Sequence, residues 1–478
     1  MAEISQTILS YLNSLYGDDS ARQYSDFINE EPAQYLRVNL LKTNKQEVTA
    51  TLRDNYSVIA EDMPGLPFAL KAVDGKEKVS KTIEHINGLF YMQGLSSMLP
   101  PLVLNAQPGE TILDLCSAPG SKTTEIGEMM LNRGTLIANE IALNRVKMLV
   151  YNIDRMNLVN AGVLHHKGEL LSKIYFEYFD RILVDAPCSG LGIIQKKEEV
   201  NNWWSVDKAE MLGDLQVRLL VAAVKMAKPG GEIVYSTCTL TPEENEFVIN
   251  TILKRYPVEI EPINLPVPSR DGFTSFNGVQ LNPALKEARR ILPWEINSDG
   301  FFIVKLRKTG ECEVPDKTVL NTRDIRLLPA SHITIAPFIK NIPEDFGIPK
   351  DILNNYRYIN KSNDLYFINN EWDDENPGLF ERIGTKFGSV DKNGKINLHT
   401  QAAQVLEKYI SKNIFEIEEQ NDLKVYLDGG IIKKDAGFAG QCVIKYNNHL
   451  LGTAVVTGAG IKSRFPRAKR TQEIMKEF

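Results

Sequence analysis

Residues 111–124 read TILDLCSAPGSKTT, an apolar run of strand length, then a turn of small residues, then the beginning of a helical segment. In an open α/β sheet, ligands bind at the carboxyl ends of the strands where the winding reverses, and small residues let backbone amides approach them. The stretch therefore predicts a ligand-binding loop between a buried strand and a helix.

The alternation of strand and helix continues on both sides of this loop, over residues 106–308. Apolar runs predict strands at 111–115, 135–139, 162–166, 181–185, 232–236 and 301–306. Helical periodicity predicts helices at 122–131, 143–156, 208–227 and 243–255, the third stopped by Pro229-Gly230-Gly231. Parallel strands joined by crossover helices give this pattern, so we predict a doubly wound, Rossmann-like α/β domain.

The flanking regions have a different character. Residues 1–105 mix a helical pattern at Ile4, Ile8, Leu9 and Leu12 with strand-like runs at 35–41 and 66–73, which predicts a small α+β domain. A linker is expected at 309–328. Residues 329–478 carry short strand candidates at 357–359, 365–368, 424–427, 441–446 and 451–457, which predicts a β-rich C-terminal region.

Composition restricts the class of protein. The 478 residues are 43% hydrophobic and 24% charged, with a formal charge of −6, which is typical of a globular chain and argues against binding nucleic acid by bulk charge alone. Residues 1–16 lack a signal-peptide pattern and no long uncharged apolar run follows, so we expect a cytoplasmic protein without a membrane span. The five cysteines lack CxxC spacing, and we expect neither disulfides nor a metal.

The loop at 116–122 does not have the spacing of the common nucleotide motifs. GxGxxG and GxxxxGK[ST] are both absent, and Gly120 is the one glycine in the turn. A nucleoside cofactor without a pyrophosphate is therefore favoured. Glu140 ends the second strand about 20 residues after Gly120, the spacing at which a carboxylate accepts ribose hydroxyls. A helix-capping or solvated glutamate is the alternative.

Two further strand ends carry reactive groups. The fourth strand ends in Asp185-Ala186-Pro187-Cys188, and the fifth ends in Ser236-Thr237-Cys238. A single cysteine is more often a small buried hydrophobe, but two thiols and a carboxylate at neighbouring strand ends indicate catalysis. The residues alone do not decide which thiol attacks.

These motifs, LCSAPGSK at 115–122, DAPCSG at 185–190 and STC at 236–238, resemble those of the NOL1/NOP2/Sun family of S-adenosylmethionine-dependent RNA cytosine-C5 methyltransferases. The resemblance extends to LRVN at 36–39 and GLFYMQGLSSM at 88–98, and covers about residues 1–308. It implies that Cys238 adds to carbon 6 of cytosine, that Asp185 hydrogen-bonds or protonates N3, and that Cys188 assists release. DNA cytosine methyltransferases use a Pro-Cys nucleophile, so the additional Thr-Cys motif favours the RNA family.

The resemblance also implies where S-adenosylmethionine binds. Its site would be formed by Cys116, Ser117, Ala118, Pro119, Gly120, Ser121 and Lys122, with Glu140 at the ribose and Asp185 near the methionine end. Lys167 occupies the position at which family members often carry an aspartate that holds the adenine amine, and Glu169 is a possible substitute. Pro293-Trp294 stands where the family commonly has Pro-His.

The substrate implied by the resemblance is RNA, with the N-terminal domain as an RNA-binding unit. The stretch 440–452 is similar to the PUA-like extension of bacterial members that act on 16S ribosomal RNA in the small ribosomal subunit. Residues 458–470 carry five basic side chains and predict a phosphate-binding arm, or else a solvated tail. Trp203-Trp204 after Lys196-Lys197 could stack a base, or pack in the core with one ring on the rim.

Three alternatives stay open from the sequence. A transfer RNA cytosine-C5 methyltransferase would use the same residues. A non-catalytic RNA-binding factor for ribosome assembly would have no need of two exposed thiols. A DNA cytosine methyltransferase is disfavoured by the Thr-Cys motif.

Overall fold

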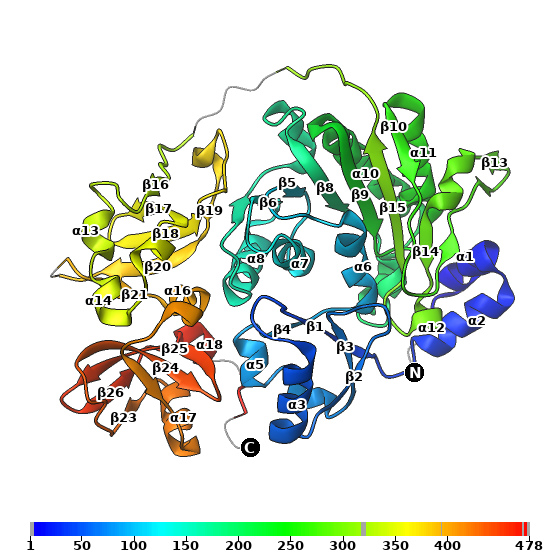
Figure 1. The fold of residues 1–478 in the computed structure, drawn as a ribbon. Coiled ribbons are helices and arrows are strands. Elements are labelled where there is room, and N and C mark those ends of the chain that lie inside the picture. The colour runs from blue at the N-terminus through cyan, green and yellow to red at the C-terminus, as the bar shows by residue number, and fades with distance from the viewer. Residues whose placement is uncertain (1–3, 317–321, 393, 471–472, 476–478) are drawn as a thin grey trace.

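The structure, a computed structural model, describes residues 4–316, 322–392, 394–470 and 473–475. Four sheets of four or more strands organise these residues (Figure 1). One is the large central sheet, one belongs to the N-terminal region, and two belong to the C-terminal region. Within the described ranges, no helix combines the length and apolar character needed to cross a bilayer.

The central sheet runs in the order β11-β14-β15-β9-β8-β5-β6-β7-β19, with β10 paired to β15. Strands β9, β8, β5, β6 and β7 are parallel to one another, and the strands outside them pair antiparallel. Their bounds are β5 (Thr111–Asp114), β6 (Thr135–Asn139), β7 (Ala161–Leu164), β8 (Phe179–Asp185), β9 (Ala227–Thr237), β10 (Val258–Glu261), β11 (Arg270–Asp271), β14 (Arg289–Ile291), β15 (Phe301–Lys308) and β19 (Arg382–Ile383). The chain winds from β5 to β6 and β7 on one side and to β8 and β9 on the other, so the switch point lies between β5 and β8.

Helices cover both faces of this sheet. On one face lie α6 (Leu95–Leu104), α7 (Ser121–Met129) and α8 (Leu143–Arg155), which pack on Ile112, Leu136 and Leu183. On the other lie α10 (Val206–Met226), α11 (Glu246–Arg255) and the 3₁₀ helix η1 (Gly168–Lys173), which pack on alternate strand residues such as Leu113 and Ile182. Strand side chains alternate between faces, so both faces bury an apolar layer. The predicted doubly wound α/β domain is confirmed.

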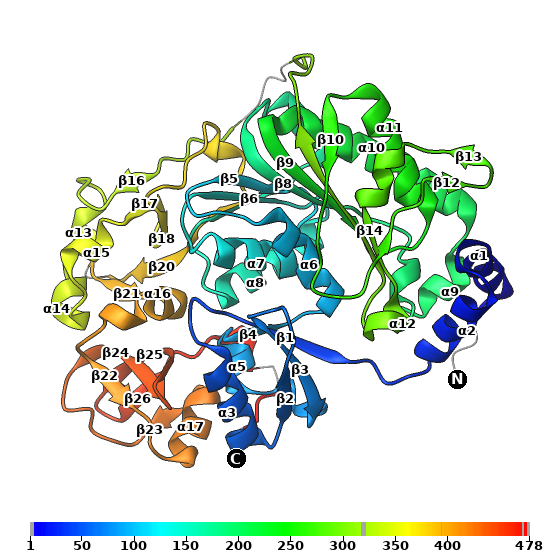
Figure 2. The same ribbon diagram turned by 45° about the vertical axis from the view of Figure 1, so that its right-hand side comes forward.

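The N-terminal region is α+β, as predicted. Its antiparallel sheet has the order β2 (Ile59–Asp62), β3 (Ala69–Asp74), β1 (Gln34–Val38), β4 (Phe90–Met92). Helices α3 (Lys45–Tyr56), α4 (Lys76–Val79) and α5 (Ile83–Ile86) accompany it. Helices α1 (Gln6–Tyr16) and α2 (Asp18–Phe27) instead pack beside α12 (Pro293–Ile296) on the central domain (Figure 2).

Trp294 forms part of the surface on which α1 and α2 pack. Its ring lies edge-on to the rings of Tyr16 and Tyr24, with centroids 6.0 and 5.7 Å away. An apolar ring at this position thus provides the surface on which the two helices rest.

The C-terminal region is β-rich, as predicted, and contains two sheets of five strands. The first has the order β16 (Leu328–Pro329), β17 (Tyr356–Lys361), β18 (Asp364–Asn369), β20 (Thr385–Val390), β21 (Ile396–Leu398). The second has the order β22 (Ile414–Glu416), β24 (Gly440–Tyr446), β25 (His449–Thr457), β26 (Gly460–Ser463), β23 (Ile431–Ile432). Of the predicted linker at 309–328, residues 317–321 lie outside the described residues.

The remaining elements are short and join these sheets. A two-stranded ribbon pairs β12 (Ser275–Phe276) with β13 (Val279–Gln280). The other helices are η2 (Leu191–Ile193), α9 (Glu199–Trp203), η3 (Pro242–Glu244), η4 (Pro283–Glu287), α13 (Ala336–Ile339), α14 (Ile342–Phe346), α15 (Lys350–Leu353), η5 (Pro377–Leu379), α16 (Thr400–Val405), η6 (Glu407–Tyr409), α17 (Gln420–Leu427) and α18 (Arg467–Arg470).

One predicted strand is wrong. Residues 424–427 were expected to be extended, but they form the last turn of α17. Leu423, Tyr426 and Leu427 are buried and stand three and four positions apart, which is the spacing of one helix face rather than of a strand. The apolar run was too short for its period to distinguish the two.

Candidate active site

The loop between β5 and α7 is held in place by the neighbouring strand ends. The Ser117 amide donates to the carbonyl of Asn139 at 2.9 Å, and the Asn139 side chain donates to the carbonyls of Leu115 and His166, each at 3.1 Å. Asn139 thus ties the carboxyl ends of β5, β6 and β7 together. The sequence gives no signal for this role because an asparagine at a strand end is common.

Gly120 allows the loop after β5 to pass close to α8. Its φ is +108°, which side chains rarely adopt, and a Cβ atom there would lie 3.1 Å from Leu149 of α8. The turn therefore requires glycine both for its backbone angle and for its contact with the helix.

Asp114, the last residue of β5, lies beneath the loop and is buried. Its Oδ2 accepts the hydroxyl of Thr123 at 2.6 Å, and its Oδ1 has no hydrogen-bond partner among the described residues. Burial raises the pKa of this carboxyl to about 7, against the opposing effect of the Thr123 hydrogen bond.

Glu140 follows β6 and is buried. Its Oε1 accepts the Ala142 amide at 2.9 Å, and its Oε2 lies 3.2 Å from Nη1 of Arg145. The carboxylate is thus oriented from two sides while it lines the cavity described below.

Asp185 at the end of β8 forms an ion pair with Lys122 of α7. The Lys122 Nζ atom lies 2.7 Å from Asp185 Oδ2, and the Ser236 hydroxyl donates to Oδ1 at 2.8 Å. Burial disfavours the charged lysine, but the charge of Asp185 outweighs it and raises the pKa of Lys122. Lys122, predicted as part of the cofactor site, is therefore a buried partner of Asp185.

Cys188 and Cys238 face each other, with their Sγ atoms 3.2 Å apart. The Gly192 amide donates to the Cys238 carbonyl at 3.0 Å, and Gly192 itself packs so closely on Gly300 and Cys238 that a Cβ atom would clash with both backbones. The hydrogen bond with Cys238 and burial raise the pKa of the Cys188 thiol well above its ordinary value.

One cavity of about 580 Å³ connects these groups. Of the predicted residues, it brings together Cys116, Ala118, Glu140, Asp185, Cys188 and Cys238. Cys116 is the third thiol in the cavity, and burial raises its pKa well above the ordinary value. Ser117, Pro119, Gly120, Ser121 and Lys122 belong to the loop or to α7 but do not line the cavity.

Lys167 also lies outside the cavity lining. Its side chain is exposed at the residue before η1, whereas Gly168 and Glu169, the next two residues, line the cavity. The turn at 167–169 therefore presents its second and third residues to the cavity.

The cavity contains residues that sequence reasoning missed. Ile141 and Arg145 line it next to Glu140, and Ala186, Leu215 and Leu219 give it apolar walls. An apolar residue directly after a candidate ribose-binding acid was the available signal for Ile141. Leu215 and Leu219 carried none, because their spacing on α10 is that of any buried helix face.

Of the two adjacent tryptophans, Trp204 is buried in the core and Trp203 lines the cavity. Trp204 is 6% exposed, and its Nε1 donates to the Ser189 hydroxyl at 3.2 Å. Trp203 is half-buried and lines the cavity, with the Lys208 ammonium 5.1 Å from its ring centroid.

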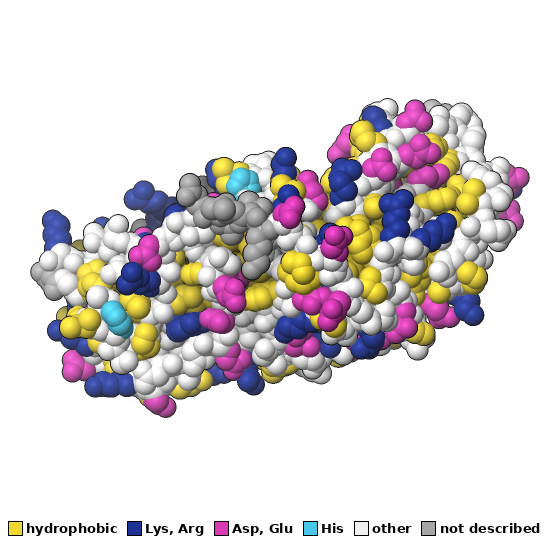
Figure 3. Space-filling view, turned by 90° about the horizontal axis from the view of Figure 1, so that it is seen from above, with side chains coloured by type: hydrophobic (Ala, Val, Ile, Leu, Met, Phe, Trp, Pro, Cys, Tyr) yellow, Lys and Arg dark blue, Asp and Glu magenta, His cyan; other side chains and the backbone are white. Residues whose placement is uncertain are grey.

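The predicted basic arm is only partly exposed. Lys462, Arg464 and Arg467 are exposed, but Lys469 is 3% exposed and donates to the Ile86 carbonyl at 2.9 Å. Lys469 therefore faces the N-terminal domain. Elsewhere, basic and acidic side chains are interspersed over the face drawn in Figure 3, with hydrophobic ones between them.

The adjacent histidines after β7 do not form a metal centre. His165 Nε2 lies 2.8 Å from the Ile141 carbonyl oxygen. Within the described ranges, no three His, Cys, Asp or Glu side chains are placed to hold a metal ion.

The fold and the cavity define the class of the protein. A mainly parallel, doubly wound sheet with a small-residue loop after β5, a carboxylate after β6 and a cavity at the switch point is the arrangement of a nucleoside-binding α/β enzyme.

Comparison with known proteins narrows this class. Residues 101–307 match the family described as "16S rRNA methyltransferase RsmB/F". The ribosomal RNA small subunit methyltransferase F of Shewanella woodyi is 31% identical over 471 residues, which is 96% of this chain and 95% of that one. The chain belongs to the RsmB/F family and is an S-adenosylmethionine-dependent RNA (cytosine-5-)-methyltransferase.

Two other relatives cover less of the chain. The tRNA (cytosine(49)-C(5))-methyltransferase of Pyrococcus abyssi is 35% identical over 293 residues, which is 61% of this chain and 93% of that one. The crystal structure of a methyltransferase homologue from Pyrococcus horikoshii has a TM-score of 0.57 at 31% identity, over 64% of this chain and all of that one.

Proposed function

We propose that this chain methylates carbon 5 of a cytosine in 16S ribosomal RNA through a covalent bond between Cys238 and carbon 6 of the base. The observation that carries the proposal is the pair of thiols 3.2 Å apart in a cavity that also contains Asp185, Glu140 and the loop after β5. A nucleoside cofactor and a flipped base both need a site at this switch point.

The residues present fit S-adenosylmethionine. When bound, it supplies a methyl group activated by a sulfonium. The 116–122 loop would hold the methionine part, the oriented carboxylate of Glu140 would accept the ribose hydroxyls, and Ile141 would contact the adenine. Gly168 and Glu169, rather than the exposed Lys167, would complete the adenine end.

In the first covalent step, the Cys238 thiolate forms a bond to carbon 6. The carbon 5–carbon 6 π electrons move toward carbon 5, which becomes nucleophilic, and N3 takes up a proton as the ring loses its aromatic character. Asp185 is the group at N3, and the Lys122 ammonium, 2.7 Å from its Oδ2, holds this carboxylate in place and supplies, through it, the proton that N3 takes up.

Release reverses the addition. After methylation, carbon 5 carries both the methyl group and its original hydrogen. A base removes that hydrogen as a proton, the double bond re-forms between carbons 5 and 6, and the bond from Cys238 to carbon 6 breaks to regenerate the thiolate. The proton on N3 returns through Asp185 to Lys122. Cys188 is the candidate to assist this release, because its sulfur is adjacent to that of Cys238 and its S–H can donate to the departing thiolate.

The fractions of this chain that align with the two relatives support 16S ribosomal RNA as the substrate. The relative named ribosomal RNA small subunit methyltransferase F aligns over 96% of the chain, including the C-terminal sheets, whereas the relative named for transfer RNA aligns over 61%. We assign residues 1–105 and the end of the β-rich region 329–478 to RNA binding, 106–308 to methyl transfer and 309–328 to a linker. Transfer RNA is the second candidate because its relative has the higher identity, 35%.

Covalent trapping tests the mechanism. With RNA that contains 5-fluorocytosine, carbon 5 cannot lose its substituent as a proton, so the wild-type protein should form a stable adduct, visible as a shifted band on a denaturing gel. We expect Cys238→Ala to form none. Cys188→Ala should form it, and should also accumulate an adduct with unmodified RNA because release is slow.

An adduct that persists in Cys238→Ala and vanishes in Cys188→Ala would assign the nucleophile to the other thiol. Full multiple-turnover activity of Cys188→Ala would remove Cys188 from the release step. Cys442→Ala is the matched control because this thiol is buried in β24, away from the cavity, and we expect it to behave as the wild type.

A further inference from the structure

Glu244, at the end of η3, is a fully buried carboxylate beside the two thiol-bearing loops. In the described part of the chain, no lysine or arginine forms an ion pair with it. Its Oε2 accepts the Ser189 amide at 2.8 Å and the Gln216 side-chain amide at 2.9 Å. Its Oε1 accepts the hydroxyls of Thr241, at 2.8 Å, and Ser189.

These hydrogen bonds favour a negatively charged Glu244. Gln216 also donates to the Pro187 carbonyl at 2.9 Å, which fixes its amide as the donor. The Trp204 indole N–H donates to the Ser189 hydroxyl, which directs that hydroxyl's own proton toward Glu244. Burial raises the pKa of Glu244, and the four donors oppose that rise by stabilising the ionised carboxylate.

Glu244 thereby connects the two loops. Ser189, Pro187 and Gln216 link it to the segment that contains Cys188, while Thr241 links it to the segment that follows Cys238. Removing the carboxylate would leave four donors to be satisfied elsewhere and would release both segments.

The two thiols have charged neighbours of opposite sign. Glu244 binds the amide of the residue that directly follows Cys188, so its negative charge lies on the Cys188 side. The ammonium of Lys122, held by Asp185, lies on the Cys238 side and interacts with that thiol. The other titratable groups around the pair are Asp185 of β8, Tyr235 of β9, Cys116 of the loop, and Glu140, Arg145, Glu169, Lys197 and Glu199 of the cavity wall.

We propose that Glu244 is a positioning residue that sets the order in which the two thiols ionise, keeping Cys188 as the thiol and leaving the thiolate to Cys238. The inference rests on the proposed function of Cys238 as nucleophile. A negative charge next to Cys188 opposes a second one there, and a protonated Cys188 can donate its S–H to the Cys238 thiolate 3.2 Å away. The charge of Glu244 contributes to the raised pKa of Cys188, after the Cys238 hydrogen bond, burial and the charge of Cys238.

The test is the alkylation rate of each thiol as a function of pH, measured by mass spectrometry of iodoacetamide-treated full-length protein without RNA. In the wild type, we expect Cys238 to react at least about tenfold faster than Cys188 at pH 7.5, equivalent to one pKa unit. In Glu244→Gln, we expect this ratio to fall several-fold. In Glu244→Asp, which keeps the charge, we expect most of the preference to persist.

Glu243→Gln is the matched control. Glu243 is the adjacent glutamate and accepts the Tyr11 hydroxyl instead of contacting the thiol loops, so its replacement should leave the alkylation ratio at the wild-type value. An unchanged ratio in folded Glu244→Gln would overturn the proposal.

A second measurement avoids any folding defect of the Glu244 variants. In Cys238→Ala, Glu244 stays in place while the neighbouring thiol is lost, so Cys188 should still require a pH above about 9 for half-maximal alkylation. If Cys188 in this variant titrates with the ordinary thiol pKa of about 8.5, then Cys238, and not Glu244, suppresses the ionisation of Cys188 in the wild type. Because these rates are measured without RNA, their outcome is separate from the trapping result that tests Cys238 as nucleophile.

Discussion

At the scale of single residues, three basic side chains from distant parts of the sequence meet at the carbonyls that end α5. Arg155 donates to the His85 carbonyl at 2.7 Å, Lys469 donates to the Ile86 carbonyl at 2.9 Å, and Lys42 donates to the Asn87 carbonyl. The carbonyls at a helix end carry partial negative charge, which suits cations. Burial, and the charge of Arg155, lower the pKa of Lys469 to about 7.

This pKa predicts a pH dependence of stability. The lysine is neutral above about pH 7 in the folded protein but stays protonated up to about pH 10.4 when unfolded, so between these values the unfolded chain binds more protons and stability rises with pH. We expect Lys469→Met to reduce the rise in the free energy of unfolding between pH 7 and 9 by up to about 1.4 kcal/mol per pH unit, measured by urea denaturation.

The exposed Lys462 of β26 provides the control. Lys462→Met should leave the slope of stability against pH at the wild-type value. A slope for Lys469→Met equal to that of the wild type would show that the buried lysine does not titrate in this range.

The sequence could indicate which side chains lie close together only where a pattern encodes their position. The loop after β5, Glu140, Asp185 and both cysteines stand at strand ends, and a parallel sheet necessarily brings strand ends to one edge. Lys469 was expected in an exposed basic arm, because a run of basic residues does not show which of them contacts another domain. Glu244 carried no signal because its partners come from three separate segments.

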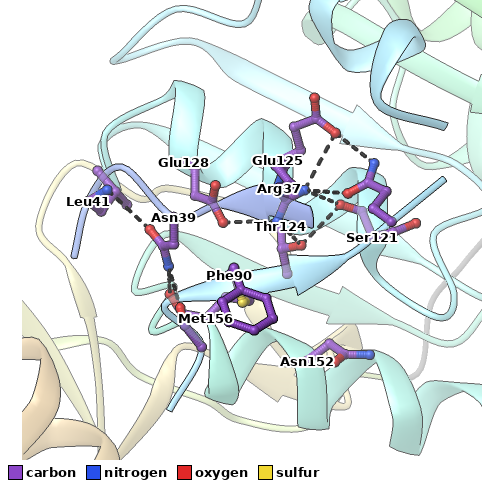
Figure 4. Close-up of polar contacts among 12 residues, drawn as sticks. Arg37, Asn39, Leu41, Phe90, Ser121, Thr124, Glu125, Glu128, Asn152 and Met156 are labelled. Atoms are coloured by element: carbon purple, nitrogen blue, oxygen red, sulfur yellow. Dashed lines mark hydrogen bonds and ion pairs between the residues drawn. The ribbon is translucent and has the colours of Figure 1, made fainter. Parts of the chain in front are cut away.

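At the scale of elements, β1 of the N-terminal sheet is joined to the first turns of α7, the helix that follows the cofactor loop (Figure 4). The guanidinium of Arg37 donates to the Ser121 carbonyl at 2.7 Å and to the Thr124 hydroxyl at 2.9 Å. It also forms ion pairs with Glu125 and Glu128. Two residues further, Asn39 donates to the carbonyl of Met156, just after α8, at 3.1 Å.

Arg37→Gln should therefore weaken both stability and cofactor binding. Arg37 is 1% exposed, and breaking a buried ion pair by removing one partner costs about 3–5 kcal/mol. We expect a loss of that order in the free energy of unfolding, measured by urea denaturation. In the protein that remains folded, we expect weaker binding of S-adenosylmethionine by calorimetric titration because α7 and its loop lose an anchor.

Arg53→Gln is the comparison, since Arg53 pairs with Asp54 on the solvent-exposed face of α3. This variant should match the wild type in both measurements. If Arg37→Gln bound S-adenosylmethionine with wild-type affinity, the contact would be structural only and would not position the loop.

Whether a helix or strand could be predicted depends on how clearly its hydrophobic residues repeat along the sequence. Strand β6 spans the predicted 135–139, and α8 ends one residue before the predicted 156, because buried parallel strands and amphipathic helices repeat clearly. Residues 424–427 were predicted as a strand and form helix α17. Strand β19 was not predicted at all, because two residues have no detectable period.

At the scale of the whole molecule, the C-terminal region is built onto both other parts of the chain. Its strand β19 extends the central sheet by pairing with β7, and Trp372 and Phe380 fill the space above Gly162, where a Cβ atom would lie within 2.8 Å of either ring. Its last sheet shares a buried apolar cluster with Ile83 and Ile86 of α5. Figures 1 and 2 both show this sheet beside the N-terminal one.

This arrangement bears on the RNA substrate. A C-terminal region fixed to the N-terminal sheet places two candidate RNA-binding units on one side of the central domain. The relative named for transfer RNA matches only 61% of this chain, whereas the relative named for the small ribosomal subunit aligns over 96%. We therefore expect the intact chain to discriminate among RNA classes.

The measurement that tests the central claim most directly is transfer of a labelled methyl group from S-adenosylmethionine to naked 16S ribosomal RNA, small ribosomal subunits, transfer RNA and DNA, with the product nucleoside identified. We expect 5-methylcytidine in ribosomal RNA or its subunit, formed by the wild type and abolished in Cys238→Ala. Label in 5-methylcytidine that persists in Cys238→Ala, or that appears only in transfer RNA or DNA, would contradict it.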